Sequence, residues 1–69
     1  MVTSNNLVVG LFVDRSIPQH WIVQDRAGDF WIIPPVENPW ENRERFFPTE
    51  ETNLEPVPGH YKYVLGLPC

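Results

Sequence analysis

The sequence predicts a small, mainly β domain of the α+β class. Two features carry this prediction: the apolar, β-branched run 7–13, and the two further runs of residues 20–34, which a tight turn joins. The expected fold has a three-stranded antiparallel meander over 7–34, one short helix, a proline-rich strap and a C-terminal strand. The 69 residues fit one domain, in which the sheet is open or closed into a small barrel.

The hairpin 20–34 is predicted from its turn chemistry. Asp25 suits the first position of a type I turn, and Gly28 can take the left-handed conformation that closes such a turn with a bulge. Counting outward from this closure gives four cross-strand pairs, namely Gln24 with Phe30, Val23 with Trp31, Ile22 with Ile32, and Trp21 with Ile33. Alternation then places Trp21, Val23, Trp31 and Ile33 on one face and His20, Ile22, Phe30 and Ile32 on the other.

Both faces of this hairpin are apolar, although an antiparallel sheet with one solvated face alternates apolar and polar residues. Each face therefore needs a cover, which is either the rest of the chain or another molecule. A chain of this length buries only about 60% of its unfolded surface. Its single cysteine, Cys69, cannot form an internal disulfide. We therefore expect a partner or a homo-oligomer to contribute to stability.

Glycine and proline residues predict where the strands of the meander bend and end. Residues 1–6 are expected to fray, and Gly10 marks a bulge or bend in the first strand. A turn over 14–18 leads into the second strand at about Gln19, and Pro34-Pro35 ends the meander because proline cannot donate to a ladder.

The segment 35–59 is acidic and proline-rich, and it contains the predicted helix. Asn38 suits an N-cap, Pro39 the first helical position and Glu41 the third, which predicts a helix from Pro39 to Phe46. Residues 54–59 then form a stiff extended strap across the sheet.

The last stretch, 60–66, allows two interpretations. Its alternating aromatic and β-branched residues favour a strand that joins the meander. Gly66, followed by Leu67 and Pro68, also resembles the end of a helix. We predict the strand.

The net charge of −4 is concentrated in one part of the chain. The segment from Glu37 to Glu55 holds six glutamates and only two arginines, Arg43 and Arg45, and so accounts for the entire net charge. The glutamates are Glu37, Glu41, Glu44, Glu50, Glu51 and Glu55. Such a segment disfavours binding to phosphate backbones, so no direct nucleic-acid binding is expected. The simplest interpretation is a solvated surface.

The single thiol and the lack of a signal peptide or membrane-spanning run predict a cytoplasmic protein with no membrane association.

No catalytic or metal-binding constellation is predicted, and no cofactor. Asp25 and Asp29 face each other across the turn, where Arg26 can neutralise them, and turn formation explains both residues. His20 and His60 are the natural starting points for acid–base chemistry, but neither lies in a recognisable motif. The chain is therefore expected not to be an enzyme.

Large aromatic side chains are the strongest functional signal, because Trp and Tyr are enriched at binding hot spots. They also supply the core that a small domain needs. The predicted interaction surface consists of Trp21, Trp31, Ile33, Trp40, Phe47 and Tyr61.

A three-stranded meander followed by a short helical turn and a final strand is similar to the SH3-like small barrels. This resemblance implies peptide binding or an assembly role. We expect a non-catalytic interaction or accessory module that binds a protein partner, associates with itself through the aromatic sheet face, or both. One alternative is an acidic regulator or inhibitor that engages a basic surface through Glu37 to Glu55 and mimics the charge of a nucleic acid. Another is a small-ligand or catalytic site that forms between subunits near His20 and His60.

Overall fold

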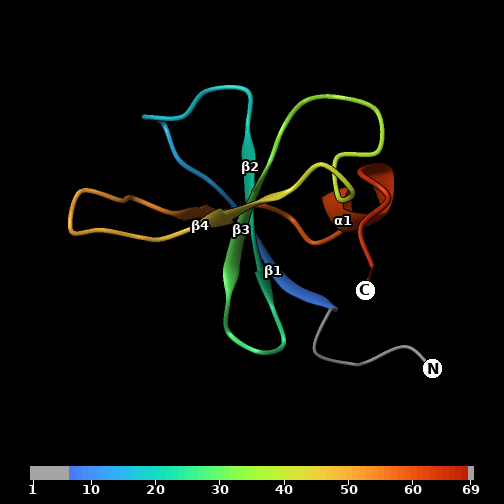
Figure 1. Ribbon diagram of the computed structural model, residues 1–69, viewed down its shortest axis with the longest axis horizontal. Coiled ribbons are helices and arrows are strands. Elements are labelled where there is room, and N and C mark those ends of the chain that lie inside the picture. Colours follow the sequence, from blue (N-terminus) through green and yellow to red (C-terminus); the bar gives the residue numbers. More distant parts are fainter. Residues whose placement is uncertain (1–6, 69) are drawn as a thin grey trace.

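One open, antiparallel five-stranded sheet forms the body of the protein, as the computed structural model of residues 7–68 shows (Figure 1). The strands are β1 (Val8–Val13), β2 (Trp21–Asp25), β3 (Phe30–Ile33), β4 (Glu44–Phe46) and β5 (Glu55–Pro56), and a short helix α1 (Tyr61–Val64) comes after them. The strand order is β4-β3-β2-β1-β5, so β4 and β5 are the two edges. This confirms the mainly β class with an open sheet. The predictions for residues 1–6 and for Cys69 lie outside the described residues.

The central hairpin has the predicted register. β2 and β3 pair Gln24 with Phe30, and the pairing continues to Trp21 with Ile33. The turn closes as its chemistry requires, because Gly28 has a φ of 92° and its N–H donates to the Asp25 carbonyl at 3.0 Å. β1 carries the predicted irregularity, a register shift between Val8 and Gly10.

The predicted helix from Pro39 to Phe46 is wrong. Residues 38–43 form consecutive tight turns, in which the N–H groups of residues 41, 42 and 43 each bond to the carbonyl three residues back, and the chain then extends into β4. Pairing with the free edge of β3, which sets Phe46 opposite Phe30 and Arg45 opposite Trp31, outweighs the local capping signal. A helix of only two turns has little stability of its own to oppose this.

The predicted strand over 60–66 is also wrong, and the helical alternative holds. α1 ends at Val64 with Leu65 as its C-cap, and the next residue, Gly66, has a φ of 70°. The N–H of Leu67 donates to the Lys62 carbonyl at 2.9 Å, and that of Gly66 donates to the Tyr63 carbonyl at 3.1 Å. These two bonds make a Schellman motif, which reverses the chain and directs Leu67 back toward the sheet.

The main core lies on the sheet face that carries Trp21, Val23, Trp31 and Ile33. Its buried side chains are Val8, Leu11, Val23, Ile33 and Leu67. Leu67 comes from the segment after α1, and Trp40, Val57 and Leu65 pack around the same cluster. The second half of the chain therefore covers this face.

The opposite face has a smaller apolar centre around Ile22, which is only 1% exposed. The rings of Phe12 and Phe30 come from the strands on either side of β2, and their centroids approach to 6.3 Å, so they meet over β2. On this face, Ile22 is thus covered by one ring of β1, Phe12, and one ring of the hairpin itself, Phe30.

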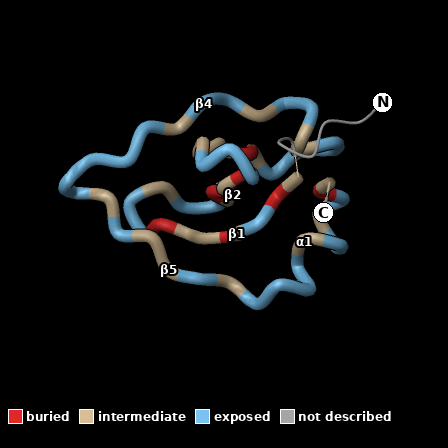
Figure 2. Tube along the Cα trace, turned by 90° about the horizontal axis from the view of Figure 1, so that it is seen from below, coloured by how far each residue is buried: buried red, intermediate tan, exposed pale blue. Residues whose placement is uncertain are grey.

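The chain after β3 encircles the hairpin. Figure 2 shows β4 on one side, a long exposed loop, β5 on the other side and α1 beyond it. The ring closes where the N–H of Val8 donates to the Pro68 carbonyl at 2.7 Å. Within residues 7–68, no helix is long and apolar enough to cross a lipid bilayer.

Candidate functional site

A groove of about 570 Å³ lies between the turns after β3 and the end of α1. Half-buried Pro39, Trp40 and Leu65 form its floor. Its walls are exposed residues from both segments, and they are Val36, Glu37, Asn38, Glu41, Tyr63, Val64 and Gly66. The volume lies within the range of about 300–1,000 Å³ that is usual for ligand pockets.

The first wall is a turn held by backbone and amide hydrogen bonds. Asn38 has a φ of 55°, a left-handed conformation that asparagine tolerates better than most residues. Its carbonyl accepts from the N–H of Glu41 at 3.1 Å and from the side-chain amide of Asn42 at 3.1 Å. The same amide donates to the Glu37 carbonyl at 3.4 Å. These bonds hold the backbone of the turn and do not involve the carboxylates of Glu37 and Glu41.

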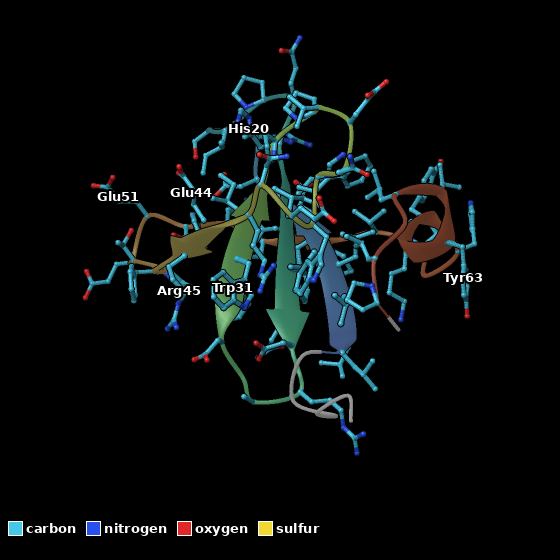
Figure 3. All side chains as sticks on the ribbon, turned by 45° about the vertical axis from the view of Figure 1, so that its right-hand side comes forward. His20, Trp31, Glu44, Arg45, Glu51 and Tyr63 are labelled. Atoms are coloured by element: carbon cyan, nitrogen blue, oxygen red, sulfur yellow. The ribbon has the colours of Figure 1, made fainter. Side chains whose placement is uncertain are left out.

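The second wall is α1 with its C-terminal turn. The helix contributes no fully buried residue. It is anchored by Leu65 and Leu67, which belong to the core. Tyr63 and Val64 remain 74% exposed, and Figure 3 shows Tyr63 projecting from α1 away from the sheet. With Val36, 51% exposed on the facing wall, these residues place apolar surface on both sides of the groove.

Below the floor, arginine and aromatic side chains alternate in a stack. The guanidinium carbon of Arg43 lies 4.2 Å from the ring centroid of Trp40 and 4.8 Å from that of Trp31. Arg45 lies 5.0 Å from the Trp31 ring on the neighbouring strand, and Figure 3 shows the two side by side. Its guanidinium is also 5.3 Å from the exposed Phe47 ring. Cation–π attraction thus joins β3, β4 and the groove floor.

Arg43 is held tightly in this stack. It donates from Nη1 to the Trp40 carbonyl at 2.9 Å. Its buried Nε has no hydrogen-bond partner among the described residues. Because an unpaired buried donor has a cost, the stacking on two indole rings must offset it.

Asp25 fixes the other side of Trp31. Its carboxylate accepts from the Trp31 indole N–H and from the Asp29 backbone N–H, both at 3.0 Å. Burial raises the pKa of Asp25, but the hydrogen bonds from Trp31 and from the turn backbone together lower it by more than burial raises it. The pKa of Asp25 therefore lies below its ordinary value. Arg45, rather than Arg26, pairs with Asp29, at 3.3 Å.

Asp14 plays a similar part at the far end of β1. Its carboxylate accepts from the backbone N–H and the hydroxyl of Ser16, at 2.9 and 2.8 Å, and from the N–H of Asn53 at 3.3 Å. The Ser16 bonds lower the pKa of Asp14 below its ordinary value. Asp14 therefore ties the loop after β1 to the segment that leads into β5.

The residues predicted as an interaction surface do not form one exposed patch. Ile33 is fully buried in the core, and Trp21, Trp31 and Trp40 are half-buried around it. Trp21 packs on Tyr61 of α1, with ring centroids 5.9 Å apart. Phe47 is 70% exposed beside Arg45. Trp40 alone of this set lines the groove.

The acidic residues are also dispersed. Glu37 and Glu41 line the groove, whereas Glu50 and Glu51 lie in the loop between β4 and β5. Figure 3 shows Glu51 and Tyr63 at opposite sides of the molecule. Glu44 lies on the edge strand β4, and Glu55 pairs with Arg15 at 3.2 Å.

The two histidines lie in local arrangements. His20 Nδ1 is 3.0 Å from the Pro18 carbonyl oxygen, and the His60 ring stacks on the adjacent Tyr61 with centroids 4.4 Å apart. Among residues 7–68, no three His, Cys, Asp or Glu side chains converge as a metal site would require.

Sequence reasoning missed the exposed apolar rim of the groove. Val36, between the two prolines and the acidic run, and Val64, in the expected strand, carried no distinct signal. The Gly66-Leu67-Pro68 pattern could have indicated Val64, because a helix that ends just before Gly66 leaves Val64 exposed, whereas no signal pointed to Val36. Comparison with protein-family models, curated proteins and solved structures gives no significant match for this chain.

Proposed function

We propose that this protein is a non-catalytic interaction module that binds a partner protein in the groove between residues 36–41 and 63–66. The observation that carries the proposal is the exposed apolar rim. Val36, Tyr63 and Val64 are all more than half exposed and belong to one groove. Three exposed apolar side chains that line one groove, beside two exposed glutamates, give a mixed surface of the kind found at non-obligate protein interfaces.

The groove takes the place of the sheet face expected from the sequence. Ile33 is buried in the core, and Trp21 and Trp31 are half-buried against other parts of the same chain, so these residues do not form one open surface on the sheet. Trp40 links the two surfaces, because it packs on the core and also lines the groove. A large, half-buried ring in the floor of a groove is a common anchor point for a ligand side chain.

A selection from a random peptide library displayed on phage, with the purified protein as bait, tests this proposal. Selected peptides are then measured by fluorescence polarisation against the wild type, the double variant Val36→Thr/Val64→Thr and the control Val9→Thr. Val9 and Val36 are matched in exposure, at 53% and 51%, but Val9 lies on β1. Threonine keeps the shape of valine and removes apolar surface.

We expect the double groove variant to bind the selected peptides about tenfold more weakly, because two methyl contacts are lost. Val9→Thr should bind them as the wild type does. Peptides that bind all three proteins equally, or a selection that yields no binder, would contradict the proposal. Circular dichroism checks that the variants keep the fold.

A further inference from the structure

We infer that the groove takes an extended peptide segment of the partner that carries Lys or Arg side chains beside an apolar one. This inference rests on the proposed interaction function and specifies its ligand. It depends on the combination of carboxylates and apolar surface in one groove, at Glu37, Glu41, Trp40 and Leu65.

The charge of the groove is of one sign. Glu37 and Glu41 are exposed on its wall, and none of the ten residues that line it is basic. Within the described residues, neither carboxylate takes part in an ion pair. The nearest basic residues along the chain are Arg43, which is held between the rings of Trp31 and Trp40, and Lys62. Two unpaired carboxylates in a concave site focus a negative potential that attracts cations.

The combination of carboxylates and apolar surface in the groove suits the long side chains of Lys and Arg. Lys and Arg have apolar stems with a charge only at the tip, so the stem can lie on apolar surface while the tip reaches a carboxylate. Half-buried Trp40 and Leu65 offer that surface, and the exposed Glu37 and Glu41 line the same groove. Val36 and Val64 on opposite walls can hold an apolar side chain of the same segment.

The same negative charges disfavour two other occupants of the groove, a second copy of this chain and a nucleic acid. A second copy of this chain, docked groove to groove, would bring the Glu37 and Glu41 carboxylates of both copies together, and like charges at close range oppose binding. Nucleic acid would place its phosphates against them. A basic segment is the occupant that the wall complements.

Both walls are shaped before any ligand arrives. One is held by the Asn38 turn and the other by the Schellman bonds of Gly66 and Leu67. Because these are bonds within each wall, binding need not order either segment, which reduces the entropic cost of association.

The test uses two decapeptides with the same apolar side chains, one with three arginines and the other with three glutamates at the same positions. Binding of each is measured by fluorescence polarisation to the wild type, Glu37→Gln/Glu41→Gln and the matched control Glu50→Gln/Glu51→Gln. Both double variants change the net charge by the same amount, but Glu50 and Glu51 lie in the loop away from the groove.

We expect the arginine peptide to bind at least about tenfold more tightly than the glutamate peptide, and its affinity to fall steeply as salt rises from about 0.02 to 0.3 M. The Glu37→Gln/Glu41→Gln variant should lose about fivefold in affinity for it, and the control less than twofold. Chemical-shift changes of the Trp40 indole N–H should accompany binding to the wild type.

Equal losses in the two double variants would show a general charge effect and overturn the inference. So would equal binding of the two peptides, or a dimer of the free protein whose formation blocks the groove. These results are distinct from failure of the proposed function. If the library selection yields groove-dependent peptides without basic residues, the interaction function stands and only the inferred ligand chemistry fails.

Discussion

The indole N–H of Trp31 donates a 3.0 Å hydrogen bond to the Asp25 carboxylate, and this contact joins the arginine–tryptophan stack to the hairpin turn. Both partners come from the central hairpin, and neither lies in the groove. The bond therefore acts on the stability of the sheet, and through Trp31 on the position of Trp40, whose ring centroid is 6.5 Å away.

Stability should depend on the charge of Asp25. Its folded-state pKa is lower than its ordinary value of 3.8, so the carboxylate stabilises the fold fully at pH above about 5 and loses this contribution as the pH falls through the folded-state pKa. Asp25→Asn should lower the free energy of unfolding at pH 7 by about 1 kcal/mol. It should also flatten the fall in stability below pH 5.

Urea unfolding at a series of pH values measures this effect. The fall does not vanish in the variant, because the lowered pKa of Asp14 contributes with the same sign. Trp31→Phe keeps a ring but removes the donor, so a double-mutant cycle with Asp25→Asn isolates the hydrogen bond. A cycle with no coupling between the two changes would refute its role.

Arg43→Gln should lower the free energy of unfolding by about 1–2 kcal/mol, since two cation–π contacts are lost. The matched control is Arg15→Gln, which removes an arginine whose side chain is 86% exposed and which pairs only at the surface with Glu55. We expect the control to change stability by less than about 0.5 kcal/mol. Chemical denaturation followed by tryptophan fluorescence compares the two, and similar effects would argue against the stack.

Gly28→Ala should destabilise the hairpin by about 1 kcal/mol. The cost comes from the backbone alone, because Gly28 has a φ of 92° and an added methyl group would meet no atom within 4 Å. Gly59→Ala is the control, as Gly59 does not have a left-handed φ and its nearest neighbour would be Lys62 Cε at 3.8 Å. Thermal melts should separate the two variants, and an equal loss of stability in both would count against a conformational role for Gly28.

Leu67→Ala should cost about 2–5 kcal/mol, the usual range for a truncated core leucine. Leu67 is only 6% exposed and joins the core from a segment beyond α1. In a domain of this size that loss is a large part of the total stability, so much of the variant should be unfolded at 37 °C. Val64→Ala, three residues earlier and 74% exposed, should leave the melting temperature within a few degrees of the wild type.

The part of the fold that local chemistry dictates could be predicted from the sequence. The Asp25–Gly28 turn sets the register of β2 and β3, and the bulge near Gly10 and the end of β3 before Pro34 depend on single residues. Short-range rules suffice there because the partners are close in sequence.

The remainder depends on contacts between distant residues. The chain does turn at Asn38, but through a left-handed backbone with a φ of 55° and not into a capped helix, and residues 44–46 pair with the free edge of β3 as β4. At 61–64 the alternation of side chains favoured a strand, and the cap at Gly66 favoured a helix. The helix forms because its C-terminal turn at Gly66 reverses the chain and allows Leu67 to be buried in the core. The groove arises from these two segments, so neither its walls nor its exposed rim could be placed before both were known.

The closure of the ring at Val8 and Pro68 has a consequence for biosynthesis. β1, β2 and β3 are translated before Leu67, which completes the core on their sheet face. On the ribosome, the nascent meander therefore exposes apolar surface until Leu67 has emerged, and at this stage it is most open to chaperones and to misassembly. A residue that follows α1 thus sets when these three strands become protected.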